Sequence, residues 1–190
     1  GTASFDSARR KPIVQTFRHL KTDAEFTLVA VHFKSKGIQS FGAENEDKGD
    51  GQGKNNGLRL QQADDLNNWL ATQPTGSLDP DYLLIGDFNA YAQENPITRL
   101  DAYGYKSLLP MHSYSYVYDG FWGSLDHALA THAMASQVTR AEKWHINSDE
   151  ATVLDYNTEY KTPEQVKDYY DTSVFRSSDH DPIIIGLRLK

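Results

Sequence analysis

Polar side chains that can carry acid–base or metal chemistry gather at the ends of short apolar runs. The runs read LVAVHF, YLLIGDFN, SLDHALAT and, in the reverse order, SSDHDPIII. The polar groups in them are His32, Asp87, Asn89, Asp126, Asp179 and His180. In layered α/β folds, the ends of adjacent strands form ligand sites, because the rigid sheet fixes the side chains there. The pattern therefore predicts a functional site.

Taken singly, most of these residues also have a simpler explanation. His32 could be a hydrogen-bonded histidine of the core, and Asp87 with Asn89 could form a turn. The SDHDP stretch could likewise be a turn before its proline. Asp126 is harder to explain in this way, because a carboxylate within an apolar strand is costly unless it is paired or binds a metal.

The composition limits the classes of function. The chain has 190 residues, no cysteine and a net charge of −7. The length suits one domain, and the lack of cysteine excludes disulfides, thiolate catalysis and cysteine-bound zinc. No apolar stretch approaches the ~20 residues that cross a bilayer. The negative charge opposes a simple basic surface for nucleic acid, but carboxylates around a divalent cation reverse the local sign.

The order of the expected elements indicates a layered α/β or α+β fold. We expect strands at 25–33, 82–85, 124–131 and 182–190, the first of them buried on both faces. Amphipathic spacing predicts helices at 58–73 and 95–105, and TPEQVKDYY predicts a short helix capped by Thr162. Residues 37–57 form a long polar loop, and 147–178 are expected to be mostly irregular.

Together, the motifs resemble the endonuclease/exonuclease/phosphatase superfamily. A strand that ends in His32 comes first, and the motifs GDFN, LDH and SDHDP follow it in that order. The segments HFKSKG, GDGQGKNNGLR, LLIGDFNAY, SLDHALAT and FRSSDHDPIIIGL are similar to those of secreted bacterial extracellular nucleases. The resemblance implies part of a four-layer α/β/β/α sandwich like that of the deoxyribonucleases. Cysteines that often flank the glycine-rich loop in that group are absent here.

The resemblance also implies the roles of the catalytic residues. His180 resembles the histidine at the scissile phosphate, oriented by Asp126. Asp87 resembles the residue that positions or deprotonates the attacking water, and Asn89 the amide that contacts a phosphate oxygen. His32 resembles the second histidine of the deoxyribonuclease branch. A His–Asp pair suits proton transfer, since the carboxylate fixes the imidazole tautomer and adjusts its pKa.

Metal and phosphate ligands follow from the same resemblance. Asp179 resembles the metal-associated aspartate, with Asp87 as a second candidate, and Arg10 resembles a phosphate-contacting arginine just before a strand. Oxygen ligands favour Mg²⁺ or Mn²⁺. The loop at 44–57 could bind Ca²⁺ through Asp47 and Asp50, although its spacing is not that of an EF-hand, and a solvated loop is the alternative.

The resemblance covers the second half of the superfamily domain, residues 1–190 being its C-terminal portion. The first-strand asparagine and the metal-binding glutamate of the superfamily precede the arginine segment, and no QE pair occurs before Arg10. We therefore expect the N-terminal portion of the same protein as a partner, weak or no activity from this chain alone, and bare apolar surface on the half-fold.

Three functions remain open from the sequence. The leading one is a secreted, divalent-metal-dependent nuclease acting on DNA, with RNA as a further substrate. A phosphoesterase similar to sphingomyelinases or inositol phosphatases would use the same catalytic set. A non-catalytic module that keeps the fold is the third. The missing glutamate keeps this alternative open, whereas the presence of Asp87, Asn89, Asp126, Asp179 and His180 speaks against it.

Two features have no assigned partner in the sequence. The aromatic residues upstream of Asp126 could stack on a base or sugar, or could pack at a sheet edge; they are Tyr114, Tyr116, Tyr118, Phe121 and Trp122. Asp181, next to the proposed catalytic histidine, has no implied role, and we expect it to be solvated.

Overall fold

A five-stranded sheet organises the computed structural model, which describes residues 3–8 and 10–190. Its strands lie in the order β1 (Ile13–Arg18), β2 (Glu25–His32), β3 (Tyr82–Asp87), β7 (Asp126–Ala130) and β4 (Lys106–Ser107). The β2–β3 pair is parallel and the other pairs are antiparallel. The sequence pattern thus correctly predicts β2, β3 and β7.

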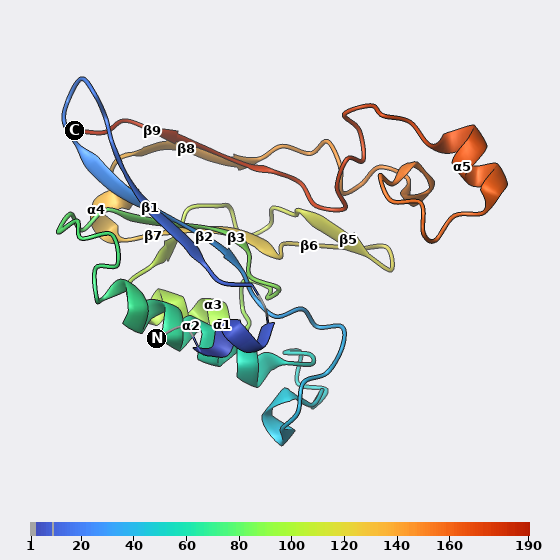
Figure 1. Ribbon diagram of the computed structural model, residues 1–190, viewed down its shortest axis with the longest axis horizontal. Coiled ribbons are helices and arrows are strands. Elements are labelled where there is room, and N and C mark those ends of the chain that lie inside the picture. Colours follow the sequence, from blue (N-terminus) through green and yellow to red (C-terminus); the bar gives the residue numbers. More distant parts are fainter. Residues whose placement is uncertain (1–2, 9) are drawn as a thin grey trace.

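Three helices cover one face of this sheet (Figure 1). They are α1 (Ala3–Ala8), α2 (Asn56–Leu70) and α3 (Asn95–Ala102). Phe5, Leu66 and Leu100 from these helices pack with Val29 and Leu84 of the sheet in the larger core cluster. Pro96 lies in the first turn of α3, where its missing N–H costs nothing. Among the described residues, no helix has the length and apolar character needed to cross a bilayer.

A second, two-stranded sheet lies against the opposite face (Figure 1). It pairs β8 (Val138–Lys143) with β9 (Ile183–Leu187), and the short α4 (His132–Ala135) precedes it. Leu83 and Met134 form the smaller core cluster with Ile185 and Leu187 of β9 packed against it. The described part of the chain therefore has three layers of the expected four-layer α/β/β/α sandwich: helices, sheet and sheet.

The expected burial of the 25–33 strand on both faces is wrong. Residues of β2 alternate, with Val29 and Val31 buried and Ala30 and His32 exposed. The reason is that the second sheet is narrow: Leu28 packs with its apolar residues, but Ala30 and His32 lie beyond its cover.

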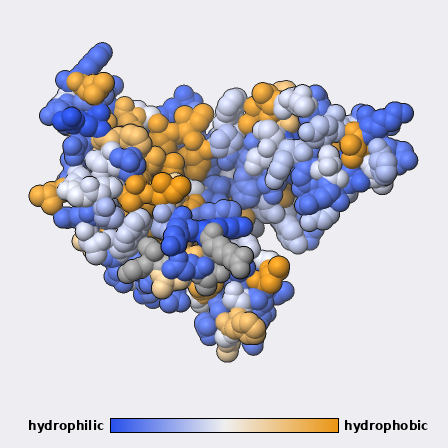
Figure 2. All heavy atoms as spheres, viewed as in Figure 1, coloured by the Kyte–Doolittle hydropathy of each residue, from blue (hydrophilic) through white to orange (hydrophobic). Residues whose placement is uncertain are grey.

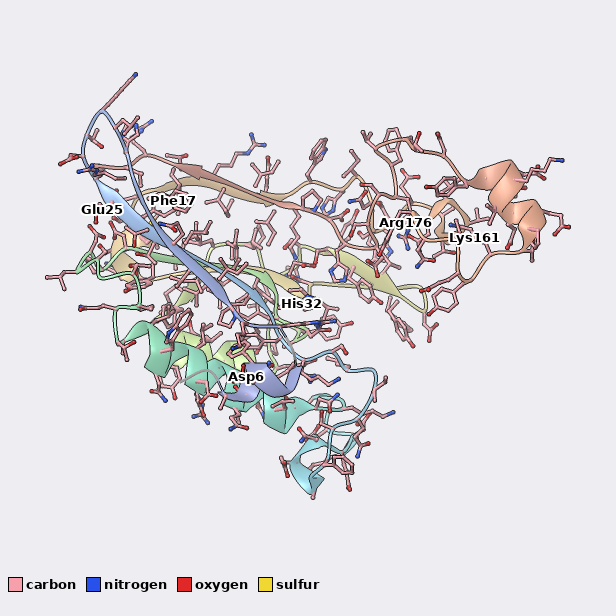
Figure 3. All side chains as sticks on the ribbon, viewed as in Figure 1. Asp6, Phe17, Glu25, His32, Lys161 and Arg176 are labelled. Atoms are coloured by element: carbon pink, nitrogen blue, oxygen red, sulfur yellow. The ribbon has the colours of Figure 1, made fainter. Side chains whose placement is uncertain are left out.

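Apolar side chains remain exposed on the strands. Ile13 and Phe17 of β1 and Ile184 of β9 are exposed, and Figure 2 shows apolar residues gathered over the strands of the viewed face. Phe17 lies at the opposite end of the β1–β2 pair from His32 (Figure 3). The sequence predicts exposed apolar surface on this part of the fold, and these strands have it.

The short η1 (Ala43–Asn45) lies against α2, whereas a hairpin and a long C-terminal segment project from one end of the sheets. The β5–β6 hairpin (Tyr116–Tyr118 and Phe121–Gly123) lies there. The segment at 144–182 forms an extended lobe that contains η2 (Thr152–Leu154) and α5 (Pro163–Tyr169) (Figure 1). As expected, Thr162 caps α5, in a reciprocal capping box with Gln165. The buried Arg176 fastens the lobe by donating to the carbonyls of Asn147 and Ser148.

Candidate active site

Three of the predicted residues lie side by side in one row of the larger sheet. His32 is paired with Asp87 across the parallel β2–β3 ladder, and Asp87 is paired with Asp126 across β3–β7. Residues directly opposite in a ladder direct their side chains to the same face. The backbone register alone therefore brings an imidazole and two carboxylates together.

The GDFN segment has the backbone needed to end β3 at this row. Gly86 has φ 139°, and a Cβ there would lie 2.0 Å from the carbonyl oxygen of Val31, so only glycine fits. Asn89 adopts the left-handed region at φ 48°, and its backbone N–H donates to Asp87 Oδ1 at 2.7 Å. Its side-chain Nδ2 donates to Asp87 Oδ2 and to the Phe33 carbonyl, both at 3.0 Å. The GDFN segment therefore forms the turn that ends β3, and its hydrogen bonds hold the Asp87 carboxylate in place.

His180 and Asp126 form a hydrogen-bonded pair, as predicted. His180 Nδ1 lies 2.7 Å from Asp126 Oδ2, which also accepts a bond from Ser115 Oγ at 2.6 Å. Tyr116 forms an isolated bridge with His180, and their rings lie 4.7 Å apart. With Nδ1–H donated to the carboxylate, Nε2 is the nitrogen left for chemistry.

The electrostatics of this pair favour the protonated imidazole. Burial alone lowers the pKa of His180, but its hydrogen bond to Asp126 and the charges of Asp126, Asp87 and Asp179 raise that pKa above its ordinary value of 6.5. The stabilisation from this pair is complete below pH 6.5 and is lost as the pH rises through the elevated pKa.

This balance predicts the effect of removing the carboxylate. In Asp126→Asn the pKa of His180 should fall, because burial then acts with less compensation. NMR titration of the imidazole resonances measures the change directly. Asp101→Asn, at an exposed carboxylate paired with Lys106, is the matched control and should leave His180 unaltered. An unchanged His180 titration in Asp126→Asn would contradict the pairing.

A second cluster joins His32, Arg10 and Asp87. The Arg10 guanidinium contacts His32 Nε2, and the same nitrogen lies 3.2 Å from Asp87 Oδ2. One nitrogen cannot accept from arginine and donate to a carboxylate at once, so only one of the two contacts is a hydrogen bond at a time. His32 is half exposed, so the core-histidine explanation is wrong for this residue.

The predicted metal ligands border the same site. Asp179 and Asp87 both raise the pKa of Tyr116 as well as that of His180, although burial is the largest cause for Tyr116. Two carboxylates fit Mg²⁺, which usually takes one or two of them together with water and substrate phosphate. Within residues 3–8 and 10–190, no three His, Cys, Asp or Glu side chains cluster as a preformed metal cage.

Ca²⁺ binding and a solvated loop were the two alternatives for residues 44–57, and the carboxylates there have local backbone partners. Asp47 Oδ1 accepts from the Gly49 N–H and Asp50 Oδ1 from the Gln52 N–H, each at 3.0 Å. These are short-range turn contacts of the kind that aspartate forms in polar loops.

The expectation that Asp181 is solvated is wrong. Its carboxylate is fully buried and accepts from the backbone N–H groups of Ile146, Asn147 and Ser148 at 3.3, 3.0 and 2.9 Å. Ser148 Oγ and His145 Nδ1 also lie 2.6 and 2.8 Å from Oδ2. Burial raises the pKa of Asp181, but the bonds to Ser148 and His145 outweigh it and leave the pKa below 3.8.

Lys143 is a site residue that the sequence analysis missed. It is buried, and its ammonium group donates to Ser124 Oγ. Burial lowers the pKa of Lys143 to about 8, against the opposing charges of Asp126 and Asp181. A cation here balances the charge of Asp126, which holds His180, and that of the buried Asp181, which holds residues 145–148. Its position in the polar run VTRAEK gave no signal of burial.

Solved structures with a similar fold align with most of the chain. An endonuclease/exonuclease/phosphatase from Bacteroides vulgatus matches with 15% identity and a TM-score of 0.55, over 95% of this chain and 56% of that one. The beta toxin of Staphylococcus aureus matches with 13% identity and a TM-score of 0.57, over 94% and 57%. The chain has the endonuclease/exonuclease/phosphatase fold.

The endonuclease domain of TRAS1, a telomere-specific non-LTR retrotransposon, shares this endonuclease/exonuclease/phosphatase fold, with 14% identity, a TM-score of 0.51, and coverage of 94% and 64%. The chain spans about half the length of the first solved structures that it matches. No protein-family model matches the sequence, and no curated protein matches it. The likeness to these solved structures is therefore found by comparing folds, not by comparing whole sequences.

Proposed function

We propose that the protein containing this chain hydrolyses phosphodiester bonds in nucleic acid with the help of a divalent metal ion. The observation that carries the proposal is the single sheet row of His32, Asp87 and Asp126, with His180 bonded to Asp126. A row of this kind combines proton-transfer groups and metal-binding oxygen atoms at one rigid edge. The shared fold supports the same class of reaction.

Phosphodiester hydrolysis needs an aligned water, neutralised phosphate oxygens and support for the leaving oxygen. Asp87, held by Asn89, is placed to orient or deprotonate the water. His180, whose raised pKa favours the charged form, donates from Nε2 to the phosphate or to the leaving oxygen. Arg10 supplies a positive charge next to His32. Such groups each contribute through geometry and charge fixed before the reaction.

A bound Mg²⁺ or Mn²⁺ would supply charge neutralisation at the phosphate oxygens. Asp179 and Asp87 are the residues that would hold it, since both carboxylates border His180 and Tyr116. The Asn89 amide uses its two N–H groups to hold Asp87 and the Phe33 carbonyl, and its neutral side chain does not compete for the cation.

Chelation tests the metal requirement. EDTA should lower hydrolysis of labelled DNA and RNA oligonucleotides by roughly a hundredfold or more, and added Mg²⁺ should restore it. The same protein assayed on p-nitrophenyl phosphorylcholine tests the lipid-headgroup alternative. Full activity in EDTA would refute the metal, and faster hydrolysis of the phosphorylcholine ester would refute the choice of nucleic acid.

A further inference from the structure

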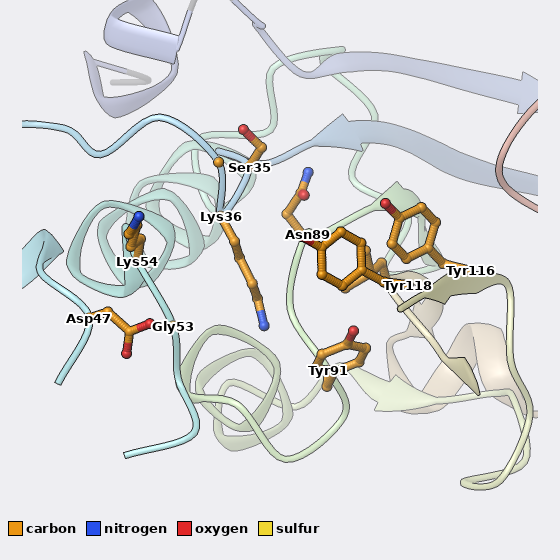
Figure 4. A pocket seen from close by; sticks show the side chains of 11 residues that line it. Ser35, Lys36, Asp47, Gly53, Lys54, Asn89, Tyr91, Tyr116 and Tyr118 are labelled. Atoms are coloured by element: carbon orange, nitrogen blue, oxygen red, sulfur yellow. The ribbon is translucent and has the colours of Figure 1, made fainter. Parts of the chain in front are cut away.

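A pocket of about 460 Å³ opens beside the proposed catalytic row. Asn89 and Tyr116 belong both to this pocket and to the surroundings of Asp87 and His180. Figure 4 shows tyrosines on one side, Asp47 and Lys54 on the other, and Lys36 extending between them. Its volume lies in the usual range for small-ligand pockets, about 300 to 1,000 Å³.

The aromatic side of the pocket consists of Tyr91, Tyr116 and Tyr118. Tyr116 and Tyr118 are nearly parallel, with ring centroids 6.4 Å apart and planes inclined by 14°. Tyr91 rests against β6 at Gly123, where an added Cβ would lie 2.3 Å from its ring. Tyr91 and Tyr118 are both exposed. Aromatic faces that are fixed on one side and open on the other are suited to stacking.

The opposite side of the pocket carries Lys36 and Lys54 beside the carboxylate of Asp47, and buried groups hold it in place. The fully buried Arg59 donates to the carbonyls of Lys54 and Gln52, at 2.8 and 2.9 Å. Lys36 pairs with the buried Glu94, and its ammonium group lies 4.3 Å from the centre of the Tyr91 ring. This loop is therefore an ordered wall that presents two lysines to the pocket.

We propose that this pocket binds one unstacked nucleotide next to the scissile phosphate, with its base on the exposed Tyr118 and a flanking phosphate at Lys36 and Lys54. The inference rests on the proposed nuclease function and gives it a substrate class. A base can enter an aromatic pocket only when it leaves its own stack, so single-stranded substrates are favoured over duplex. Stacking tolerates any base, since each has a π-face.

A pair of probes that differ only in the base tests the pocket without turnover. We expect the protein that contains this chain, followed by NMR titration in EDTA, to bind adenosine 5′-monophosphate about tenfold more tightly than ribose 5-phosphate. Shifted resonances should include those of Tyr91 and Tyr118. Equal affinity for the two probes would overturn the proposal and would favour a site that recognises phosphate alone.

Substitutions on the exposed hairpin provide matched controls. Tyr118→Leu should remove most of the preference for the nucleotide, whereas Tyr118→Phe, which keeps the ring, should retain it. Tyr169→Leu, at an exposed tyrosine of α5 far along the lobe, should behave as the unaltered chain. A preference that survives Tyr118→Leu would overturn the assignment of the base to this wall.

The two proposals fail separately. Selective nucleotide binding, combined with no metal-dependent hydrolysis by the protein that contains this chain, would refute the reaction and keep the binding site. Metal-dependent hydrolysis combined with equal binding of the two probes would keep the reaction and refute the binding site.

Discussion

Replacing His180 by alanine is expected to slow phosphodiester hydrolysis by about a hundredfold to ten-thousandfold, the usual contribution of a positioned acid–base group. The fold should persist, because Asp126 keeps its bond from Ser115 at 2.6 Å when the imidazole is removed. Steady-state rates on a labelled oligonucleotide measure the loss. Circular dichroism and the urea midpoint measure the fold.

The control for this variant is His19→Ala. His19 is exposed just after β1 and contacts Thr22, at the end of that strand away from Arg10. It should leave the rate and the urea midpoint nearly unchanged. A His180→Ala protein with the native rate would exclude the residue from the reaction, whatever its effect on stability.

The largest effect on stability is expected at Asp181. Asp181→Ala should lower the free energy of unfolding by about 3 kcal/mol, because it leaves several buried donors of the 145–148 turn without an acceptor. Urea unfolding measures the change. Asp149→Ala, at an exposed carboxylate of the same turn that accepts one bond from Tyr114, should cost less than about 1 kcal/mol. Equal losses in the two variants would contradict the anchoring role of Asp181.

Acid titration gives an independent test of the same residue. The pKa of Asp181 is lowered below 3.8 in the folded protein. Its charge therefore stabilises the fold fully above pH 3.8, and this stabilisation disappears as the pH falls through the lowered pKa. Asp181→Asn should flatten the stability profile in that acid range. An unaltered acid profile would show that the carboxylate does not titrate as inferred.

Local sequence patterns were sufficient for the elements that carry the row. The short apolar runs correctly predict β2, β3 and β7, and Asp126 was expected to need a partner because of its apolar strand. The partner, His180, lies 54 positions away, so the motif resemblance, and not the local pattern, predicted that pair. The capped helix at Thr162 was predicted from the preference of threonine for that position.

The other features of the fold and the site depend on contacts between distant residues, which a local sequence pattern does not contain. Asp181 is buried by a turn 33 to 36 positions upstream, and an aspartate in a polar stretch is usually solvated. The strand β8 reads VTRAEK, with too few apolar residues for an alternating pattern. Arg59 is fully buried because it binds carbonyls of the loop that precedes its helix, and an arginine on a helix is normally exposed.

The sheet register has a consequence for engineering this protein. The residues of the row face the site only while each strand keeps its register. A shift of one position turns every side chain of that strand to the other face of the sheet. Deleting one residue within β2 would replace His32 at its row by a neighbour and would turn apolar core residues outward. Loops between the strands tolerate changes of length far better. Libraries of variants should therefore change the connections and leave the spacing within the strands untouched.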